Sequence, residues 1–192
     1  MMQQIIHPDD TVTLGNYYAM TQPTGWALEF SYNRLPVRLL DCGRVILRPS
    51  EAEQAFFTLQ IVSWLDGQAE HDYFLELLKL DGAITADTLA NLYPILLAVS
   101  HHYITYASVL DHAGIGRSLL IEYEVADLFE KGRVIYAPAP SGHADVFIAS
   151  YEGKEPSYSS HMSEVQAALD SVRKNEFTED IFGEDERAQI SI

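Results

Sequence analysis

Large apolar residues alternate with small or polar ones in the first third of the chain, a pattern typical of half-buried β-strands. In residues 26–33 this period of two places one set of side chains on a single face: Trp26, Leu28, Phe30 and Tyr32. The sequence Asp-Cys-Gly at 41–43 indicates a turn. We therefore expect a hairpin whose strands are 37–40 and 44–48, joined by residues 41–43.

Residues 50–64 carry two conflicting signals. Ser50 and Glu53 have the spacing of a capping box, which would begin a helix. Residues 56–64, however, alternate and are rich in aromatic and β-branched side chains, which favour a strand. We expect a strand over 56–64, and this strand completes an N-terminal antiparallel meander.

The middle of the chain shows the 3.6-residue spacing of amphipathic helices. A first helix is predicted over 70–80. Thr85 is the predicted N-cap of a second helix, because a threonine side chain accepts a hydrogen bond from a first-turn amide. The second helix is expected to run to Asp111 with a kink at Pro94, where the backbone donor is missing. A third helix is expected over 118–130.

The last part of the chain combines a second small hairpin with a helix. Short strands are predicted over 133–137 and 145–151, and the polar residues 152–160 are expected to form a linker. The spacing of the next apolar residues predicts an amphipathic helix with a narrow stripe: Met162, Val165, Leu169 and Val172. Residues 175–192 are acidic and without pattern, so we expect a mobile tail.

Size and composition fit a single α+β domain. The chain has 192 residues, of which 47% are hydrophobic, enough to form one core at ~100–200 residues per domain. We expect an α+β core domain over 1–151, followed by the linker, helix and tail over 152–192. The sequence contains one Cys, which excludes a disulfide framework and a Cys-based zinc site. We expect no cofactor and no bound metal.

The net charge restricts the possible functions more than the composition does. Lys and Arg number 12 against 28 Asp and Glu, a formal net charge of −16. This excess argues against direct binding to nucleic acid or to an anionic membrane, both of which require a basic face. It keeps a protein dispersed in solution, and it also attracts a basic partner. No targeting segment is evident, so we expect a cytoplasmic protein.

Four residues could form a reaction centre, and they are His101, His102, Asp111 and His112. On a helix, His101, Thr105, Ser108 and His112 form one polar stripe. The i, i+4 ligand pair of helical zinc sites is absent, and His101 and His112 would lie about 16 Å apart along the axis. We interpret the stripe as a polar helix face. A metal-dependent hydrolase that uses this His/Asp/Glu cluster is kept as an alternative.

The candidate partner-binding residues come from the third predicted helix and the acidic tail. They are Glu122, Glu124, Asp127, Glu130, Phe177, Glu179, Asp180 and Phe182. Aromatic side chains in such a tail would anchor it while the acids steer. We expect a non-enzymatic acidic protein that inhibits or neutralises a basic, nucleic-acid-handling protein by electrostatic occlusion, as a nucleic-acid mimic or an immunity protein does. A secretion or escort chaperone and a homo-oligomeric structural subunit are further alternatives.

Overall fold

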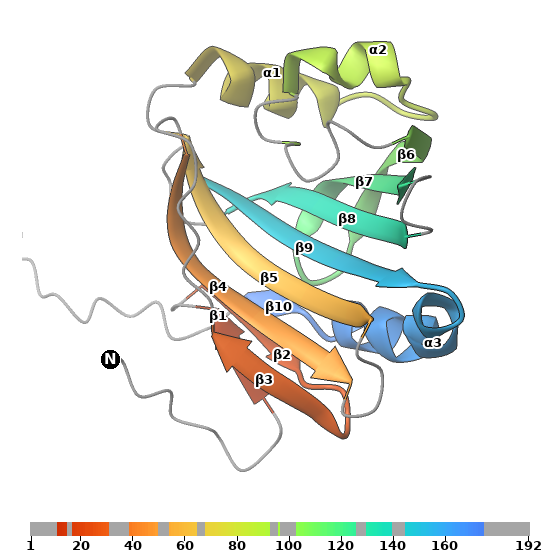
Figure 1. Cartoon of the computed structure of the whole chain (residues 1–192). Helices are drawn as coiled ribbons and strands as arrows, with labels where there is room; N and C mark the ends of the chain where they lie inside the picture. The colour runs from red at the N-terminus through yellow and green to blue at the C-terminus, as the bar shows by residue number, and fades with distance from the viewer. Residues whose placement is uncertain are drawn as a thin grey trace, which may run out of the picture.

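Seven antiparallel strands form the main sheet, in the order β3-β4-β5-β9-β8-β7-β6 (Figure 1). In that order the strands are β3 (Trp26–Phe30), β4 (Leu39–Pro49), β5 (Ala55–Trp64), β9 (Asp145–Lys154), β8 (Glu130–Pro138), β7 (Gly116–Val125) and β6 (Tyr103–His112). The computed structural model describes residues 11–14, 17–30, 39–49, 54–64, 68–92, 96, 103–125, 130–139 and 145–174. Side chains along each strand point alternately to the two faces of the sheet.

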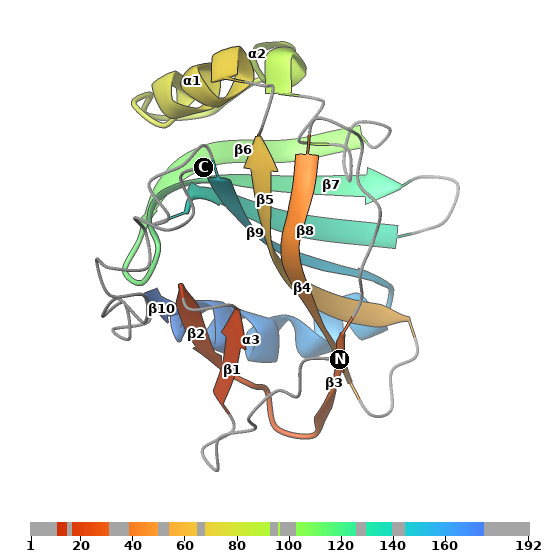
Figure 2. The ribbon, with the colours of Figure 1, turned by 90° about the vertical axis from the view of Figure 1, so that its left-hand side faces the viewer.

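A small sheet and several helices complete the fold. The small sheet has the order β1-β2-β10, formed by β1 (Thr11–Leu14), β2 (Tyr18–Thr21) and β10 (Arg173–Lys174). The helical elements are α1 (Gln68–Leu77), α2 (Ala86–Leu89), the 3-10 helix η1 (Ala90–Leu92) and α3 (Ser157–Asp170). Helices α1 and α2 lie over one end of the main sheet, and α3 lies near β1 and β2 at the other end (Figure 2). The protein is therefore of the α+β class, as predicted.

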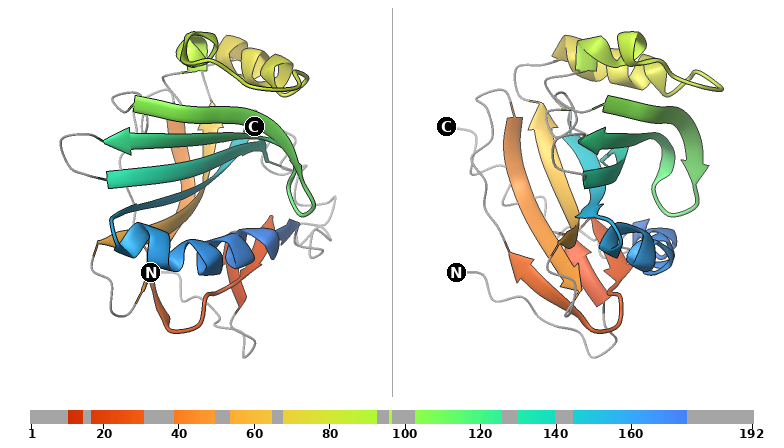
Figure 3. Two further views of the ribbon diagram at one scale, coloured as in Figure 1. Left: turned by 90° about the vertical axis from the view of Figure 1, so that its right-hand side faces the viewer. Right: turned by 45° about the vertical axis from the view of Figure 1, so that its right-hand side comes forward.

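Each face of the main sheet buries an apolar core. On β9, Phe147, Ala149 and Tyr151 belong to a first core, which also contains residues of α3 and the small sheet. Val146 and Ile148, which alternate with them, belong to a second core with residues of α1 and α2. The central strand is thus apolar on both sides, because a helical layer covers each face. Figure 3 shows α3 on the side of the sheet where β1 and β2 lie.

Helix α3 packs its apolar stripe into the first core. Val165 and Leu169 on the helix and Val172 just after it are buried, which confirms the predicted amphipathic helix. A polar contact ties the same helix to the edge of the sheet. The indole Nε1 of Trp26 on β3 donates a hydrogen bond of 2.9 Å to Oε2 of Glu164. The helix is therefore held by apolar burial and by a directional contact.

Two predicted helices are strands in the structure. Residues 103–112 form β6, where the prediction placed the helix that ends at Asp111. Residues 116–125 form β7, where the prediction placed the helix over 118–130. The two strands pair with each other as a hairpin. Both predictions are wrong for this part of the chain.

The sequence of β7 supports both a helical and a strand period. Ile121 and Val125 have helical spacing, but Leu119, Ile121 and Tyr123 also alternate and are buried in the second core. Pairing with β6 on one side and β8 on the other satisfies the backbone of β7 along its length. This long-range pairing overrides the local helical preference. Gly116, with a φ of 85°, closes the hairpin turn in a conformation that glycine adopts without strain.

Several other predictions are confirmed. Strands β3 and β5 occur where the alternation predicted them, and with β4 they form three consecutive antiparallel neighbours. Helix α1 lies within three residues of its predicted range. Thr85 caps α2, since its Oγ1 accepts a hydrogen bond of 3.2 Å from the N–H of Thr88. The helix after Thr85 is short, however, and ends at Leu89.

The predicted turn at 41–43 is not a turn. Strand β4 runs through it without reversing, because pairing with β5 continues on both sides of the segment. The register shifts between Asp41 and Arg44, so one extra residue on β4 is accommodated as a bulge. Bulges of this kind bend a strand without ending it, and the local sequence of a bulge resembles that of a turn.

The predicted linker over 152–160 is also wrong. Strand β9 runs to Lys154, and α3 begins at Ser157, so two regular elements meet here directly. The predicted strands over 133–137 and 145–151 are confirmed and extended as β8 and β9. They do not form a separate small hairpin, however, because they lie inside the main sheet between β7 and β5.

The turn between β6 and β7 lies against the end of α3. A Cβ at Gly114 would lie 1.4 Å from the carbonyl oxygen of Val172, so a larger residue does not fit. The N–H of Gly114 donates a hydrogen bond of 3.2 Å to Nδ1 of His112. Ile115, in the same turn, is buried in the first core. The hairpin is thus fixed to the C-terminal helix.

Candidate interaction surface

Strand β6 forms one edge of the main sheet and leaves most of its side chains accessible. Of its 10 described residues, Ala107 is the one that is buried. Tyr103 has 74% of its area exposed and Tyr106 has 48%. Tyrosine is enriched where proteins bind one another, because it combines a large apolar surface with a polar group. Two exposed tyrosines on one edge strand therefore make this edge a candidate interaction surface.

A bulge places both tyrosines on the same face of the sheet. Residues three apart on a regular strand point to opposite faces. The register of β6 against β7 shifts between Ile104 and Tyr106, so Tyr103 pairs with Glu124 and Tyr106 pairs with Glu122. Glu122 and Glu124 are two residues apart on β7 and share a face. The bulge therefore gathers two aromatic rings and two carboxylates on one face, and we call these four residues the β6–β7 surface.

The two carboxylates of this surface differ in their surroundings. Glu122 is half-buried and accepts hydrogen bonds from Nε and Nη2 of Arg133 at 3.0 and 2.6 Å. Arg133 is itself held from α3, because its Nη1 donates to Oε1 of Gln166 at 2.9 Å. Glu124 is exposed and forms no ion pair with any residue in the described part of the chain. One acid is thus engaged within the fold, and the other faces solvent.

The chemistry of the β6–β7 surface suits a cation. An ammonium or guanidinium group is attracted to the face of a tyrosine ring, and a carboxylate within reach adds a charge-assisted hydrogen bond. Glu124 is available for that hydrogen bond without breaking an ion pair with any described residue. Lys131 and Arg133, on the next strand, are already engaged with Glu155 and Glu122.

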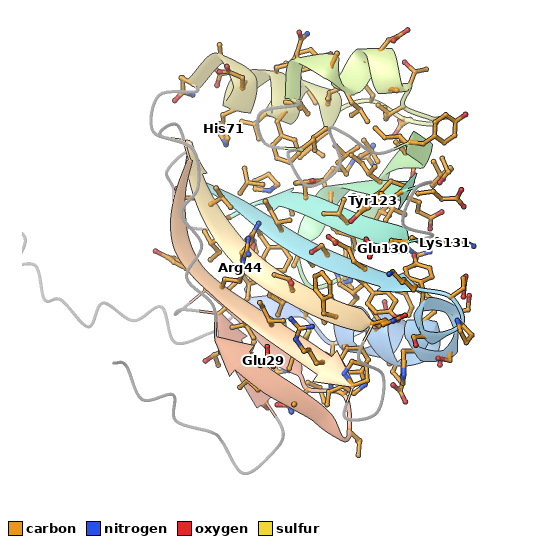
Figure 4. The ribbon with its side chains drawn as sticks, viewed as in Figure 1. Glu29, Arg44, His71, Tyr123, Glu130 and Lys131 are labelled. Carbon is orange, nitrogen blue, oxygen red and sulfur yellow. The ribbon has the colours of Figure 1, made fainter. Side chains whose placement is uncertain are left out.

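The structure separates the predicted partner-binding acids. Glu122 and Glu124 lie on the β6–β7 surface, although on a strand and not on the predicted helix. Glu130 begins β8 opposite Val125, which puts it on the other face of the sheet together with Tyr123 (Figure 4). Its Oε1 lies 3.9 Å from Nζ of Lys154. The remaining predicted residues lie outside the described part of the chain: Asp127, Phe177, Glu179, Asp180 and Phe182.

The predicted histidine stripe does not form. Asp111 and His112 are consecutive residues of β6, so their side chains point to opposite faces. Asp111 accepts a hydrogen bond of 3.0 Å from Nη1 of Arg117, and His112 interacts with its own turn. His101 and His102 lie outside the described residues. Within the described residues, no group of three or more His, Cys, Asp and Glu side chains could hold a metal ion.

A second polar group, on the opposite face, was not anticipated from the sequence. Tyr123, Gly132 and Glu152 are cross-strand neighbours on β7, β8 and β9. The Tyr123 hydroxyl interacts with the Glu152 carboxylate across the glycine. Burial raises the pKa of Glu152, while the Tyr123 hydroxyl and the charge of Arg44 act in the opposite direction. An isolated glycine within a strand is the one local signal that could have indicated the close approach.

Tyr136 lies near this group but differs from Tyr123. Burial raises the pKa of both hydroxyls, and the negative charge of Glu152 raises both further. Tyr136 is 1% exposed, and its hydroxyl has no hydrogen-bond partner in the described part of the chain. Burial of a hydroxyl without a partner costs desolvation free energy, and no hydrogen bond compensates for this cost. The face thus contains two buried tyrosine hydroxyls, and that of Tyr123 interacts with Glu152.

Comparisons with known proteins give likeness of fold alone. No family model matches the chain, and no curated protein matches it. Among solved structures, it is similar to the cyanobacterial PsbP protein (CyanoP) of Synechocystis sp. PCC 6803, with a TM-score of 0.47 and 13% identity over 82% of this chain and 86% of that one. It is also similar to LpqN of Mycobacterium tuberculosis, a protein involved in cell envelope biogenesis, with a TM-score of 0.38 and 10% identity over 82% and 90% of the two chains. No described helix is both long and apolar enough to cross a membrane.

Proposed function

We propose that this protein binds a basic protein partner through the β6–β7 surface and blocks or escorts that partner without catalysing a reaction on it. The observation that carries the proposal is the pair of exposed tyrosines beside a carboxylate that no described residue neutralises. Tyr103, Tyr106 and Glu124 together offer aromatic area, hydrogen-bonding groups and negative charge. These are the three requirements for holding lysine and arginine side chains.

The overall charge supports the same proposal. A chain with a net charge of −16 attracts a basic protein from a distance and repels acidic ones. Long-range attraction raises the association rate, and the local surface then determines which partner stays bound. Basic proteins that handle nucleic acid are the partner class that this charge suits best, because their binding channels already accept a polyanion.

Tyrosines and carboxylates have separable roles in this proposal. The tyrosines provide the binding energy, because aromatic residues near the centre of an interface are frequent hot spots. Glu124 provides selectivity for a cation, and its effect is screened by salt. Replacement of both tyrosines should therefore weaken binding at every salt concentration, whereas replacement of Glu124 should matter most at low salt.

The test is affinity capture from the native host followed by measurement with the purified partner. Wild type, the double variant Tyr103→Ala/Tyr106→Ala and Glu124→Gln are compared in about 0.1 M and about 1 M salt. The matched control is Asp87→Asn, which removes an exposed carboxylate on α2. We expect a basic partner whose affinity falls roughly 30-fold or more in the double variant, the loss of about one hot spot. An acidic partner, or equal affinity in all variants, would contradict the proposal.

The same partner distinguishes an inhibitor from an escort. An inhibitor abolishes the partner's activity while bound, and an excess of this protein keeps the partner inactive. An escort leaves the released partner active and increases the amount that stays soluble. Both outcomes use the same surface, so the variants above apply to each.

A further inference from the structure

Among the residues that the structure describes, only part of the outer edge of β6 is covered. In its middle, Ala83 forms an isolated bridge with Ser108, and the N–H of Ile84 donates a hydrogen bond of 3.0 Å to the carbonyl oxygen of Ala107. For residues 103–106, the structure shows no backbone hydrogen bond from outside the sheet within the described part of the chain. An edge strand with free amide and carbonyl groups is a template for another strand.

This edge also lacks the usual protection against strand addition. Natural edge strands frequently carry lysine, proline or inward charges that prevent pairing with another chain. Residues 103–110 contain no Lys, Arg, Asp, Glu or Pro. The bulge after Ile104 is the one protective device in the segment, and here it also orients the two tyrosines. The edge can therefore pair with an added strand, and the two tyrosines, which would favour a cationic partner, lie directly beside it.

Building on the proposed function, we propose that the partner contributes an extended, cationic segment that adds to β6 as a further strand along residues 103–106. Alternate side chains of an added strand lie on the face that carries Tyr103 and Tyr106, with directly opposed Cβ atoms about 5 Å apart. A lysine or arginine at such a position contacts a tyrosine ring. Glu124 lies one strand further, about 10 Å from the added strand, at the end of the same path.

Charge complementarity favours a cationic segment over a second copy of the chain at the edge of β6. Pairing of β6 with β6 would bring together two surfaces that each contain Glu122 and Glu124, on two molecules with a net charge of −16 each. The mutual repulsion of two molecules with this net charge opposes the pairing. A segment that alternates basic and small polar residues avoids this repulsion and places its cations on the tyrosine side.

The test uses the full chain and a short labelled peptide that alternates Arg with Thr. Two further peptides carry backbone N-methyl groups, one on every Thr and one on every Arg, and a fourth replaces Arg by Glu. In a strand, alternate residues direct their amides to the same side, so one methylated peptide loses the bonds to β6 and the other keeps them. Affinity is measured by fluorescence anisotropy, and the amides of 103–106 are followed by hydrogen exchange.

We expect the Arg–Thr peptide to bind and to slow hydrogen exchange at 103–106. One methylated peptide should bind roughly tenfold more weakly than the other, which corresponds to about one net hydrogen bond. Equal affinity of the Arg–Thr peptide and both methylated peptides overturns strand addition but leaves the proposed function standing, because side chains alone would then hold the cation. Failure of the Arg–Thr peptide to bind, or equal binding of the Glu peptide, overturns both.

Light scattering of the protein alone tests whether a second copy of the chain occupies the edge of β6. A monomer at the concentrations used for binding is the expected result. A dimer that Tyr103→Ala/Tyr106→Ala dissociates would show that a second copy occupies the edge, and it would overturn the proposal for a cationic segment.

Discussion

The ring of Tyr123 lies directly across Gly132. A Cβ built on Gly132 would be 2.1 Å from Cζ of Tyr123, well inside any real contact. This arrangement brings the Tyr123 hydroxyl to Glu152 on the far side of the glycine strand. Glycine at this position is thus required for Tyr123 on β7 to reach Glu152 on β9, and the position can be tested by substitution.

Gly132→Ala should destabilise the protein by about 1–3 kcal/mol, because the added methyl group overpacks the site. Chemical denaturation measures the difference. In a Tyr123→Ala background the same substitution should cost much less, since the ring that it strikes is gone. Equal costs in the two backgrounds would show that the ring is not the obstacle.

The two buried tyrosines provide a matched pair of variants. Tyr123→Phe removes the hydroxyl that interacts with the half-buried Glu152 carboxylate, so it should cost about 1–3 kcal/mol. Tyr136→Phe removes a hydroxyl that has no partner among the described residues, and it should be neutral or slightly stabilising. Both free energies of unfolding come from the same denaturation experiment. A large loss in Tyr136→Phe would reveal a partner for that hydroxyl.

Glu152 should make stability depend on pH in a defined direction. Its pKa is raised in the folded protein, so between the ordinary glutamate pKa of about 4.3 and the raised value the folded state binds more protons than the unfolded state. Stability from this group is therefore present below the ordinary pKa and is lost as pH rises through the folded pKa.

The variant Glu152→Gln should abolish this decline and be more stable than wild type at neutral pH, because a neutral amide avoids the desolvation of a carboxylate. Denaturation across acidic to neutral pH compares the two proteins, with Asp87→Asn as the exposed control. An identical pH profile in wild type and Glu152→Gln would contradict the assignment.

The exposed tyrosines should matter for binding and not for folding. Tyr103→Ala/Tyr106→Ala should change the free energy of unfolding by less than about 1 kcal/mol, since Tyr103 is mostly exposed and Tyr106 is about half exposed. The same variant should lose the basic partner. If unfolding becomes much easier, the rings support the fold, and the loss of binding would have a structural cause.

Local signals predicted those elements whose pattern agrees with their final pairing. The alternation in β3 and β5, the apolar stripe of α3 and the cap at Thr85 were all visible from neighbouring residues. Strands β6 and β7 were not, because Ile121 and Val125 also satisfy a helical period. The choice between the two periods depends on β8, which pairs along β7, and no local pattern contains that information.

The sequence predicts only part of the candidate surface, for the same reason. The excess of acidic residues predicts Glu122 and Glu124 as partner-binding residues, and both lie on the β6–β7 surface. The sequence does not predict a role for Tyr103 and Tyr106, because their position on an edge strand follows from topology and the bulge that places them on one face is a property of register. Cross-strand neighbours such as Tyr123 and Glu152 are distant in sequence, so their contact follows from topology.

The close fit of Gly114 against Val172 has a consequence for any molecule bound at the edge of the sheet. Strand β6 ends in the turn that packs against Val172, the last residue before β10. This end of β6 is therefore held in place by the segment that directly follows α3. Loosening of that helix, by truncation or by a cut near Val172, would release the hairpin at one end. Such a change would therefore weaken binding along β6, although the bound segment does not contact the altered residues.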